Sequence, residues 1–336
     1  MLFPYLFFHV AEVHILCVLF QVAYSQLLSE RVSSSLVSAF RESSNRQWQY
    51  AWKKFQKYLT DNQVREVTKS TTLKFLDHTF KSSQLSPKTL QVYKGALSLP
   101  LKTAFNIDTG DEEFALLIRS FFISRPPIKK APPRWSLDAL LKFLTNSTDE
   151  SDLFLLQKTL FLVALATGNR ASEISAMTRT SVVFEDNPAR VFVPVKPNFL
   201  FKNQRMNRAP PNIVIRALNS NGSEHPLCPM NFLKKYLTRT NFPNASQALF
   251  HSLRGSPLKA SDVSLQLCRL IEAACPGSVP KGHDVRKVGA SLAWCRGLSP
   301  SEIIQRAFWS SSNVFVSRYL KEVENEVQCV ALGTTM

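Results

Sequence analysis

Apolar residues recur at helical spacing in the first third of the chain. One stripe repeats at i, i+4, i+7 and i+11 and consists of Trp48, Trp52, Phe55 and Leu59. This period places all four side chains on one face of a helix. Ser44 and Asn45 precede the stripe, and both residue types cap helix N-termini, so the pattern predicts a helix that begins at one of them.

A second helix is predicted from a cap and a stripe together. Ser86 can cap it, and Pro87 occupies the first helical position, where its missing N–H costs no hydrogen bond. The face that follows is formed by Leu90, Tyr93 and Leu97. We therefore expect residues 30–124 to be a helical unit.

A proline-rich segment interrupts this helical pattern. Residues 125–134 contain four prolines in ten positions. Proline lacks an amide donor and fixes φ, so neither a helix nor a central strand is expected to run through the segment. We interpret it as a basic, semi-rigid linker whose Lys129, Lys130 and Arg134 can lie along a phosphate backbone.

The rest of the chain is mainly helical around one β-rich stretch. β-like residues 191–195 and 212–216 flank a polar, basic connection over residues 202–208. Helical patterns cover residues 136–144, 151–166, 233–237, 261–274, 285–296, 300–308 and 314–323. Residues 135–326 are thus expected to form a second domain, with a tail at 327–336. The expected fold class is α+β, mainly α with a small β-sheet.

Charge narrows the class of partner. The chain has 336 residues, with 41 Lys and Arg against 25 Asp and Glu and a formal charge of +16. Residues 1–30 contain only two acids and no Lys or Arg, so the remaining body is more basic than the whole. Such a body usually binds a polyanion, either nucleic acid or an anionic membrane surface. The candidate DNA-contacting lysines beside the two helical stripes are Lys53, Lys54, Lys57, Lys88 and Lys94.

The cysteines and the apolar opening exclude other classes. Six cysteines are scattered without CxxC or paired Cys/His spacing, which indicates neither a zinc site nor a disulfide framework. We interpret them as reduced thiols of an intracellular protein. Residues 1–29 form an apolar leader without an assigned role, and its apolar run is broken by His9, Glu12 and His14. A signal peptide over residues 1–25 would lack a basic start, so a leader or a packed helix is preferred.

Four short segments contain residues suited to phosphate chemistry. Thr167-Gly-Asn-Arg170 follows a helix that the glycine ends, and Glu173 lies where it can orient the guanidinium of Arg170. His283 and Arg286 share a helix face at i, i+3, and the other two segments contain Trp309 and Tyr319. Taken singly, each residue has an ordinary structural explanation. Taken together, two arginines, a histidine, an indole N–H and a tyrosine form a set suited to phosphoryl transfer.

The order and spacing of this set resemble the tyrosine recombinase (integrase) family. That family has an arginine in a T-G-x-R-x-S-E setting, a lysine in a β-hairpin, an H-x-x-R motif, then His or Trp, and then Tyr. Here Trp309 follows Arg286 by 23 residues, and Tyr319 follows Trp309 by 10. The segments around Lys202, Pro229 and Trp309 look like those of eukaryotic mobile-element recombinases of the DIRS and Crypton types. The resemblance covers residues 30–325.

The resemblance implies a role for each part of the chain. Residues 30–124 would be a SAM-like, DNA-binding core-binding domain, and residues 135–326 would be the catalytic domain. Tyr319 would attack a DNA phosphate and form a 3′-phosphotyrosine. The phosphate would be held by Arg170, Arg286 and the indole N–H of Trp309.

Proton transfer is assigned to two further residues. Tyrosine is a poor nucleophile at its free pKa of about 10, so it needs a base, and the resemblance assigns this role to His283. Lys202, in the expected β-connection, would protonate the leaving 5′-oxygen, with Lys196 as the alternative. Neither a metal nor any cofactor is expected, because the phosphotyrosine conserves bond energy and the sequence contains no carboxylate cluster.

The implied partner is double-stranded DNA, bound by a homo-oligomer (dimer or tetramer) without membrane contact, and the expected compartment is the nucleus. Two positions depart from the family's usual pattern. Lys287 stands where many relatives have histidine, and Trp309 replaces the commoner histidine, which the family accepts.

Three other functions compete with a recombinase. A DNA-binding protein domesticated from such an enzyme would keep the fold without cutting DNA. A type IB topoisomerase would share the chemistry, but the chain lacks the long helical linker expected before the tyrosine of such an enzyme. A secreted or membrane-surface basic protein would leave the phosphoryl-transfer set unexplained.

Overall fold

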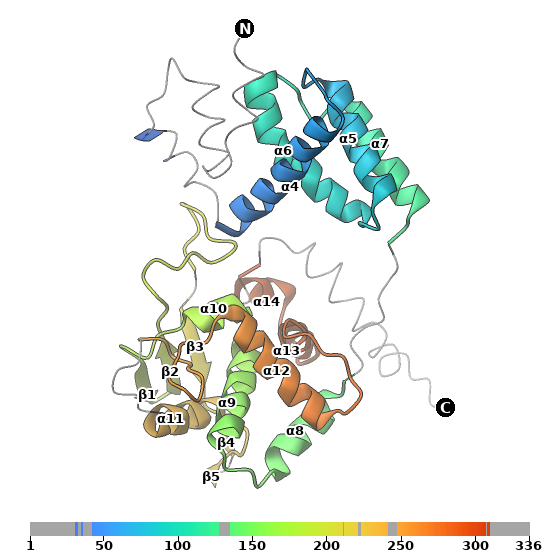
Figure 1. Cartoon of the computed structure of the whole chain (residues 1–336). Coiled ribbons are helices and arrows are strands. Elements are labelled where there is room, and N and C mark those ends of the chain that lie inside the picture. The colour runs from blue at the N-terminus through green and yellow to red at the C-terminus, as the bar shows by residue number, and fades with distance from the viewer. Residues whose placement is uncertain are drawn as a thin grey trace. The chain divides into compact units, whose positions relative to one another are not determined.

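The computed structural model describes residues 31–32, 35, 42–127, 135–210, 212–220, 223–240, 247–306 and 308–309. The chain divides into two compact units, Met1–Lys130 and Ala131–Met336, and the division falls inside the proline-rich segment (Figure 1). The described residues are mostly helical, with a three-stranded and a two-stranded antiparallel sheet, which confirms the expected fold class. The apolar leader, the tail at 327–336 and the predicted helix at 314–323 lie outside the described residues.

The first unit is built from helices that enclose an aromatic core. They are α4 (Glu42–Asp61), α5 (Lys69–Ser82), α6 (Pro87–Phe105) and α7 (Glu112–Ser124). The predicted stripe on α4 is buried at Trp52, Phe55 and Leu59. The Phe55 ring meets the Phe75 ring of α5 edge to face, with ring centroids 5.1 Å apart. Such pairs add specific geometry to apolar burial and fix the crossing of the two helices.

Helix starts in this unit follow the sequence signals unevenly. Ser86 accepts a hydrogen bond from the Thr89 amide, and Pro87 is the first residue of α6, which confirms the predicted start. The predicted start of α4 is wrong, because the helix already includes Glu42 and places Ser44 and Asn45 inside its first turns. A helix extends past a polar cap residue when preceding residues can also adopt helical geometry.

Arg125 belongs to the helical unit by its contacts rather than to a solvated linker. Its guanidinium donates to the carbonyl oxygens of Ser83 at 3.1 Å, Leu85 at 2.7 Å and Phe80 at 3.3 Å. It also lies 4.2 Å from the centroid of the Phe80 ring. The carbonyls at and beyond the end of α5 lack helical partners, so Arg125 satisfies them and fixes the end of α7 beside α5.

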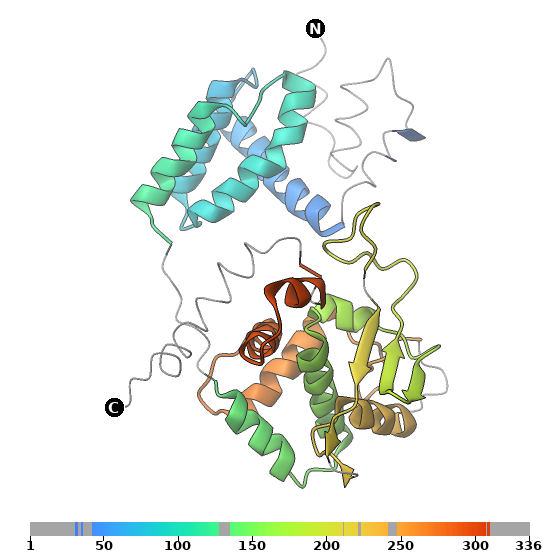
Figure 2. The same cartoon turned by 180° about the vertical axis from the view of Figure 1, so that it is seen from behind.

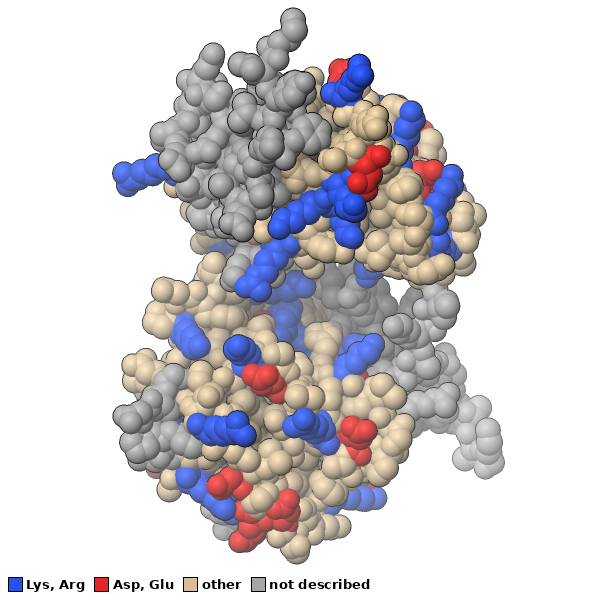
Figure 3. Space-filling view, in the orientation of Figure 1, with Lys and Arg blue, Asp and Glu red and all other residues tan. Residues whose placement is uncertain are grey.

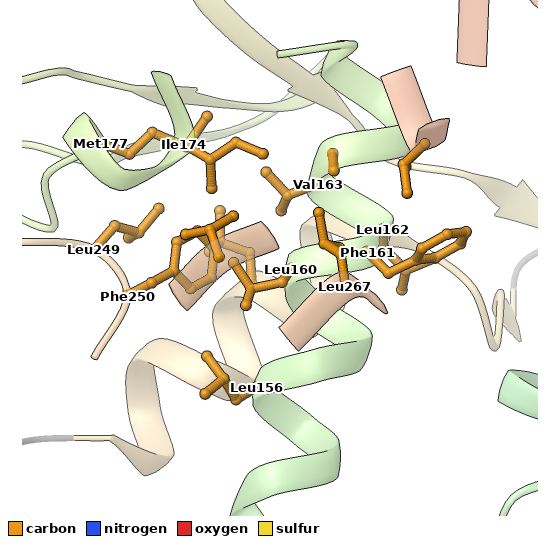
Figure 4. Packing of buried hydrophobic residues seen from close by; sticks show 14 of the residues in the cluster. Leu156, Leu160, Phe161, Leu162, Val163, Ile174, Met177, Leu249, Phe250 and Leu267 are labelled. Carbon is orange, nitrogen blue, oxygen red and sulfur yellow. The ribbon is translucent and has the colours of Figure 1, made fainter. Parts of the chain in front are cut away.

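The second unit surrounds one long, buried helix. Its helices are α8 (Leu137–Asn146), α9 (Asp152–Thr167), α10 (Ala171–Ala176), α11 (Pro229–Arg239), α12 (Ala260–Ala274), α13 (Asp284–Cys295) and α14 (Pro300–Arg306). Its strands are β1 (Val183–Asp186), β2 (Ala189–Val193), β3 (Ile213–Arg216), β4 (Asn219–Ser220) and β5 (Ser223–Glu224). Helix α9 packs against α11, α12, α13 and β3 (Figure 1). Figure 4 shows its side chains, including Leu160 and Phe161, within the packed apolar core.

The three-stranded sheet has the order β1-β2-β3, with antiparallel neighbours and Val191 opposite Ile215. Strand β2 ends at Val193, two residues earlier than predicted, and Val195 instead bridges to Met177 at the end of α10. Strand β1 has no counterpart in the predictions, because its residues are mostly exposed and carry little apolar period. The long connection from β2 to β3 leaves the sheet (Figure 2).

Two further properties concern the described residues alone. Cys228, Cys268, Cys275 and Cys295 are free cysteines. Within the part of the chain that the structure describes, no helix has both the length and the apolar character to span a bilayer.

Candidate active site

Arg170 is placed by the turn that ends α9. Gly168 adopts a left-handed conformation with φ of 63°, and its amide closes the helix by donating to the Ala164 carbonyl at 2.9 Å. Arg170 is then the N-cap of α10. Its amide donates to Glu173 Oε2 at 2.8 Å, and its guanidinium donates to Glu173 Oε1 at 2.6 Å. Both groups of one arginine are therefore fixed by a single carboxylate.

Arg286 reaches the same carboxylate from α13. Its side chain is 2% exposed, and its Nη1 lies 3.7 Å from Glu173 Oε2. The same nitrogen also donates to the carbonyl of Gly168, in the turn that precedes Arg170. Glu173 is itself 1% exposed. One buried acid thus holds two guanidinium groups whose positions are more than a hundred residues apart in the chain, and the cluster keeps a net positive charge.

Two glycines let α13 approach its neighbours closely enough to deliver Arg286. A Cβ on Gly282 would lie 2.7 Å from the Ser264 Cα of α12, which is closer than real atoms pack. A Cβ on Gly289 would lie 3.0 Å from the Leu165 carbonyl oxygen of α9. The start of α13 is also fixed by Asp284, which is 2% exposed and accepts from the Lys281 amide at 2.7 Å.

His283 is the N-cap of α13 and remains exposed. Its pKa is lowered from the ordinary value, first by partial loss of solvent and then by the charges of Arg286, Lys287 and Arg170, whereas Asp284 opposes the shift. A lowered pKa keeps the ring neutral at pH 7, the form that can accept a proton.

Trp309 covers the guanidinium of Arg286. The Arg286 Cζ lies 5.2 Å from the Trp309 ring centroid, within the range of a cation–π contact. The indole is 3% exposed and packs with Ala290 of α13 and Ile303 of α14. The side chain that the sequence predicts to contact phosphate therefore also shapes the wall around Arg286.

The two candidate lysines lie in the connection between β2 and β3. Lys202 and Lys196 are both exposed. Asn203, next to Lys202, donates from Nδ2 to the Phe308 carbonyl at 2.7 Å, which places this part of the connection beside Trp309. Lys196 instead follows the bridge to α10, and its amide donates to the Ala176 carbonyl at 2.9 Å. Lys202 thus lies next to the residue that binds the Phe308 carbonyl, whereas Lys196 lies next to the end of α10.

The predicted DNA contacts divide into three groups. Lys53, Lys54, Lys57 and Lys88 are exposed on the helical unit, and basic side chains cover more of the visible face of that unit than acidic ones do (Figure 3). Lys94 is only half exposed and donates to the Thr109 carbonyl at 3.0 Å, so it is occupied within the unit. The remaining predicted residues lie outside the described residues and are Lys129, Lys130, Arg134 and the predicted nucleophile Tyr319.

Three residues of this site escaped the sequence analysis as functional positions. Asp284 carries a signal, because an acid in the first turn of a helix is favourable. Asn203 and Arg208, whose guanidinium donates to the Trp309 carbonyl at 2.6 Å, carry none, because a polar loop residue gives no indication of the distant carbonyl that it binds. No group of three His, Cys, Asp or Glu residues in the described ranges could hold a metal ion. The arrangement is a pair of guanidinium groups with a neutral imidazole, which suits a phosphate diester.

Known proteins match both the sequence and the fold. The sequence model of the Phage integrase family matches residues 136–326, more than half of the chain. No curated protein matches the chain. The structure of the XerH site-specific recombinase bound to difH substrate, in a pre-cleavage complex, has a TM-score of 0.57 at 17% identity, over 86% of this chain and 79% of that chain.

Two further solved structures share the fold. The Tn1549 transposon integrase in complex with transposon right end DNA gives a TM-score of 0.54 at 13% identity, over 94% of this chain and 99% of that chain. A lambda integrase dimer bound to a COC′ core site gives 0.54 at 17% identity, over 86% of this chain and 75% of that chain. At these identities the likeness establishes a common architecture.

Proposed function

The chain belongs to the phage integrase family of tyrosine recombinases, and we propose that it is a site-specific recombinase of double-stranded DNA. In the proposed reaction the Tyr319 oxygen attacks a phosphodiester, forms a 3′-phosphotyrosyl bond and releases a 5′-hydroxyl. Another 5′-hydroxyl then attacks that phosphorus and releases the tyrosine. The bond energy is kept throughout, so no nucleotide is consumed.

The observation that carries this proposal is the shared contact of Arg170 and Arg286 with Glu173. Two fixed guanidinium groups can bind both non-bridging oxygens of one phosphate and stabilise the charge that develops on them. Because the arginines are oriented before DNA arrives, little reorganisation is needed when the phosphate binds. An ordinary structural ion pair would need only one arginine for this acid.

The imidazole and the β-connection supply the proton transfers. His283, neutral at pH 7 because its pKa is lowered, accepts the phenolic proton of Tyr319. Lys202 donates a proton to the leaving 5′-oxygen. The first transfer makes the phenolate that attacks, and the second prevents the leaving oxygen from departing as an alkoxide.

We infer a mobile-element origin for the chain and an oligomer as its working form. The fold is shared with a transposon integrase and with an integrase dimer on its core site. The motifs around Lys202 and Trp309 add the similarity to DIRS and Crypton recombinases. We propose that the protein acts in the nucleus, as expected for a eukaryotic mobile-element recombinase.

The test is covalent capture of the protein on DNA. Full-length protein is incubated with nicked duplexes whose sequence is randomised around the nick, so that the released fragment diffuses away and the phosphotyrosine accumulates. We expect an adduct that survives denaturing electrophoresis, and sequencing of the captured DNA then gives the target. The matched control is Tyr319→Phe, which keeps the ring and removes the nucleophile.

The outcomes separate the competing functions. If wild-type protein binds the duplexes without forming an adduct, the chain is a DNA-binding protein that no longer cuts. If Tyr319→Phe forms as much adduct as wild type, the nucleophile assignment is wrong. Relaxation of supercoiled plasmid that contains no captured sequence would instead favour a topoisomerase.

A further inference from the structure

The connection between β2 and β3 holds the backbone that carries Trp309. Asn203 donates from Nδ2 to the Phe308 carbonyl at 2.7 Å, and Arg208 donates from its guanidinium to the Trp309 carbonyl at 2.6 Å. Two consecutive carbonyls are thus bound by side chains more than a hundred residues earlier in the chain. The loop is itself closed by a pair of backbone hydrogen bonds between Arg205 and Arg208, at 3.0 and 3.3 Å.

Ring contacts reinforce these hydrogen bonds. The Arg208 guanidinium lies 4.5 Å from the centroid of the Phe308 ring. The ring of Phe201, at the start of the same loop, meets the Phe308 ring edge to face with centroids 5.9 Å apart. Phe308 is 5% exposed, so its side chain is enclosed by this loop and its neighbours. The loop therefore contacts both the backbone and the side chain of Phe308.

Phe308 is held in a conformation that its side chain disfavours. Its φ is 50°, in the left-handed region where a Cβ crowds the following carbonyl. The Phe308 amide donates to the Gln305 carbonyl at 3.2 Å, and the Trp309 amide donates to the Ile304 carbonyl at 3.0 Å. These are the two hydrogen bonds of a Schellman motif, here at the end of α14. Glycine is the usual residue at this place in the motif. A non-glycine residue persists there when its surroundings over-determine its conformation.

This turn decides where the indole of Trp309 lies. After it, the indole lies over Arg286 at 5.2 Å from Cζ and is 3% exposed. Loss of the restraint at Phe308 would let the turn relax toward an ordinary conformation and carry the indole away from the guanidinium. We propose that Asn203 and Arg208 are positioning residues, which hold Trp309 against Arg286 and so couple the loop that contains Lys202 to the phosphate-binding arginines. This inference rests on the proposed recombinase function.

The chain offers a matched control for each residue. Arg205 and Asn207 are exposed residues of the same loop and duplicate the side-chain types of Arg208 and Asn203. Single-turnover rates of adduct formation are measured at saturating DNA for Asn203→Ala, Arg208→Ala, Asn207→Ala and Arg205→Ala. Displacement of a reacting group by 1 Å can cost about 10²-fold, and we expect Asn203→Ala and Arg208→Ala to slow the reaction by about that factor.

Charge removal from the loop should affect both arginine variants alike. We expect Arg205→Ala and Arg208→Ala to weaken DNA binding to a similar extent, with the loss of rate confined to Arg208→Ala. Arg208→Lys restores the charge and one donor, so it should regain part of the rate. Equal rates for the two arginine variants, or for the two asparagine variants, would overturn the proposal.

A second readout is independent of DNA cutting. The full chain is labelled with 5-fluorotryptophan, and the ¹⁹F resonance of Trp309 is assigned by its absence in Trp309→Phe. We expect Asn203→Ala and Arg208→Ala to shift or broaden this resonance and the two control variants to leave it in place. If wild type fails to cut DNA, the proposed function fails while this spectrum still decides the contact. An unmoved Trp309 resonance in both variants overturns the positioning role even where cutting slows.

Discussion

Positive charge is used in two different ways by the two units of this protein. In the second unit, Arg170 is 17% exposed and Arg286 is 2% exposed, and both are held by the buried carboxylate of Glu173. In the helical unit, Lys57 is 71% exposed and forms an ion pair with Asp61, one turn further along α4. Lys53, Lys54 and Lys88 are exposed as well.

The contrast teaches what burial adds to a charge. A buried guanidinium without a partner would cost several kcal/mol, so the second unit must supply an acid, and the pair becomes fixed in place. An exposed lysine is already solvated and contributes little to stability in an ion pair. In the proposed reaction the first arrangement would orient the reacting phosphate, whereas the second would attract a DNA backbone over a distance set by salt.

The largest expected effect comes from removing the shared acid. Glu173→Ala leaves Arg286 buried beside Arg170 without their carboxylate, and breaking a buried pair in this way destabilises a protein by about 3–5 kcal/mol. Urea denaturation of the full chain measures the loss. The adduct-forming rate should fall as well, since neither guanidinium keeps its orientation.

Glu185→Ala is the matched control for this substitution. Glu185 accepts from Arg190 at 2.6 Å, but both side chains are more than a third exposed. Removing an ion pair that stays this accessible to solvent costs about 0–1 kcal/mol. A similar cost for Glu173→Ala and Glu185→Ala would show that burial does not distinguish the two ion pairs.

Two glycines extend the comparison to backbone packing. Gly282→Ala would place a Cβ 2.7 Å from the Ser264 Cα, and overpacking of this kind costs about 1–3 kcal/mol. Gly95→Ala, in α6 of the helical unit, meets nothing within 4 Å and should stabilise by about 0.5–1 kcal/mol, because alanine favours helices. Thermal unfolding of each variant measures the sign. Stabilisation by Gly282→Ala would contradict the close approach of α12 and α13.

The pH dependence of cleavage should reveal the electrostatics of the same cluster. The pKa of His283 is lowered from 6.5, so the base stays neutral at pH 7 and is lost only as the pH falls through the lowered pKa. Lys287→Gln removes one of the charges that depress this pKa, so the acid limb of the rate profile should move to higher pH. Lys281→Gln, which removes an exposed charge that is not among the causes of the shift, should leave the limb in place. An acid limb that Lys287→Gln fails to move would contradict the electrostatic assignment.

Local signals predicted much of the fold and half of the arginine site. The stripes on α4 and α6, the Ser86 cap and the glycine stop after α9 depend on neighbouring residues, and local sequence reports them directly. The contact of Glu173 with Arg170 is also local, at i, i+3. Its second contact, with Arg286, joins positions that no spacing relates. Resemblance to a family indicated that both arginines serve one phosphate, and Glu173 was predicted beside Arg170, whereas its contact with Arg286 came from the structure.

Other features depend on whether a charged side chain binds water or a backbone carbonyl, which the sequence does not indicate. The proline-rich pattern around Arg125 predicts a linker in contact with water. In the structure its guanidinium instead donates to three carbonyls at and beyond the end of α5. Lys94 lies beside an apolar stripe as the exposed lysines do, yet the Thr109 carbonyl occupies it. In both cases the deciding partner is a backbone carbonyl, which every residue has and no pattern marks.

The smallest effects should come from single substitutions of the exposed lysines, which change the salt dependence of DNA binding. Each lysine that contacts a DNA phosphate adds about one unit to the slope of log affinity against log salt concentration. Lys53→Gln and Lys88→Gln should therefore lower the slope by about that amount and leave unfolding unchanged. Lys94→Gln should leave the salt slope unchanged and lower the free energy of unfolding. Its ammonium group binds the Thr109 carbonyl at 3.0 Å, and a lost hydrogen bond costs about 1 kcal/mol. A salt slope that drops for Lys94→Gln and stays constant for Lys53→Gln would place the DNA backbone on a different face of the helical unit.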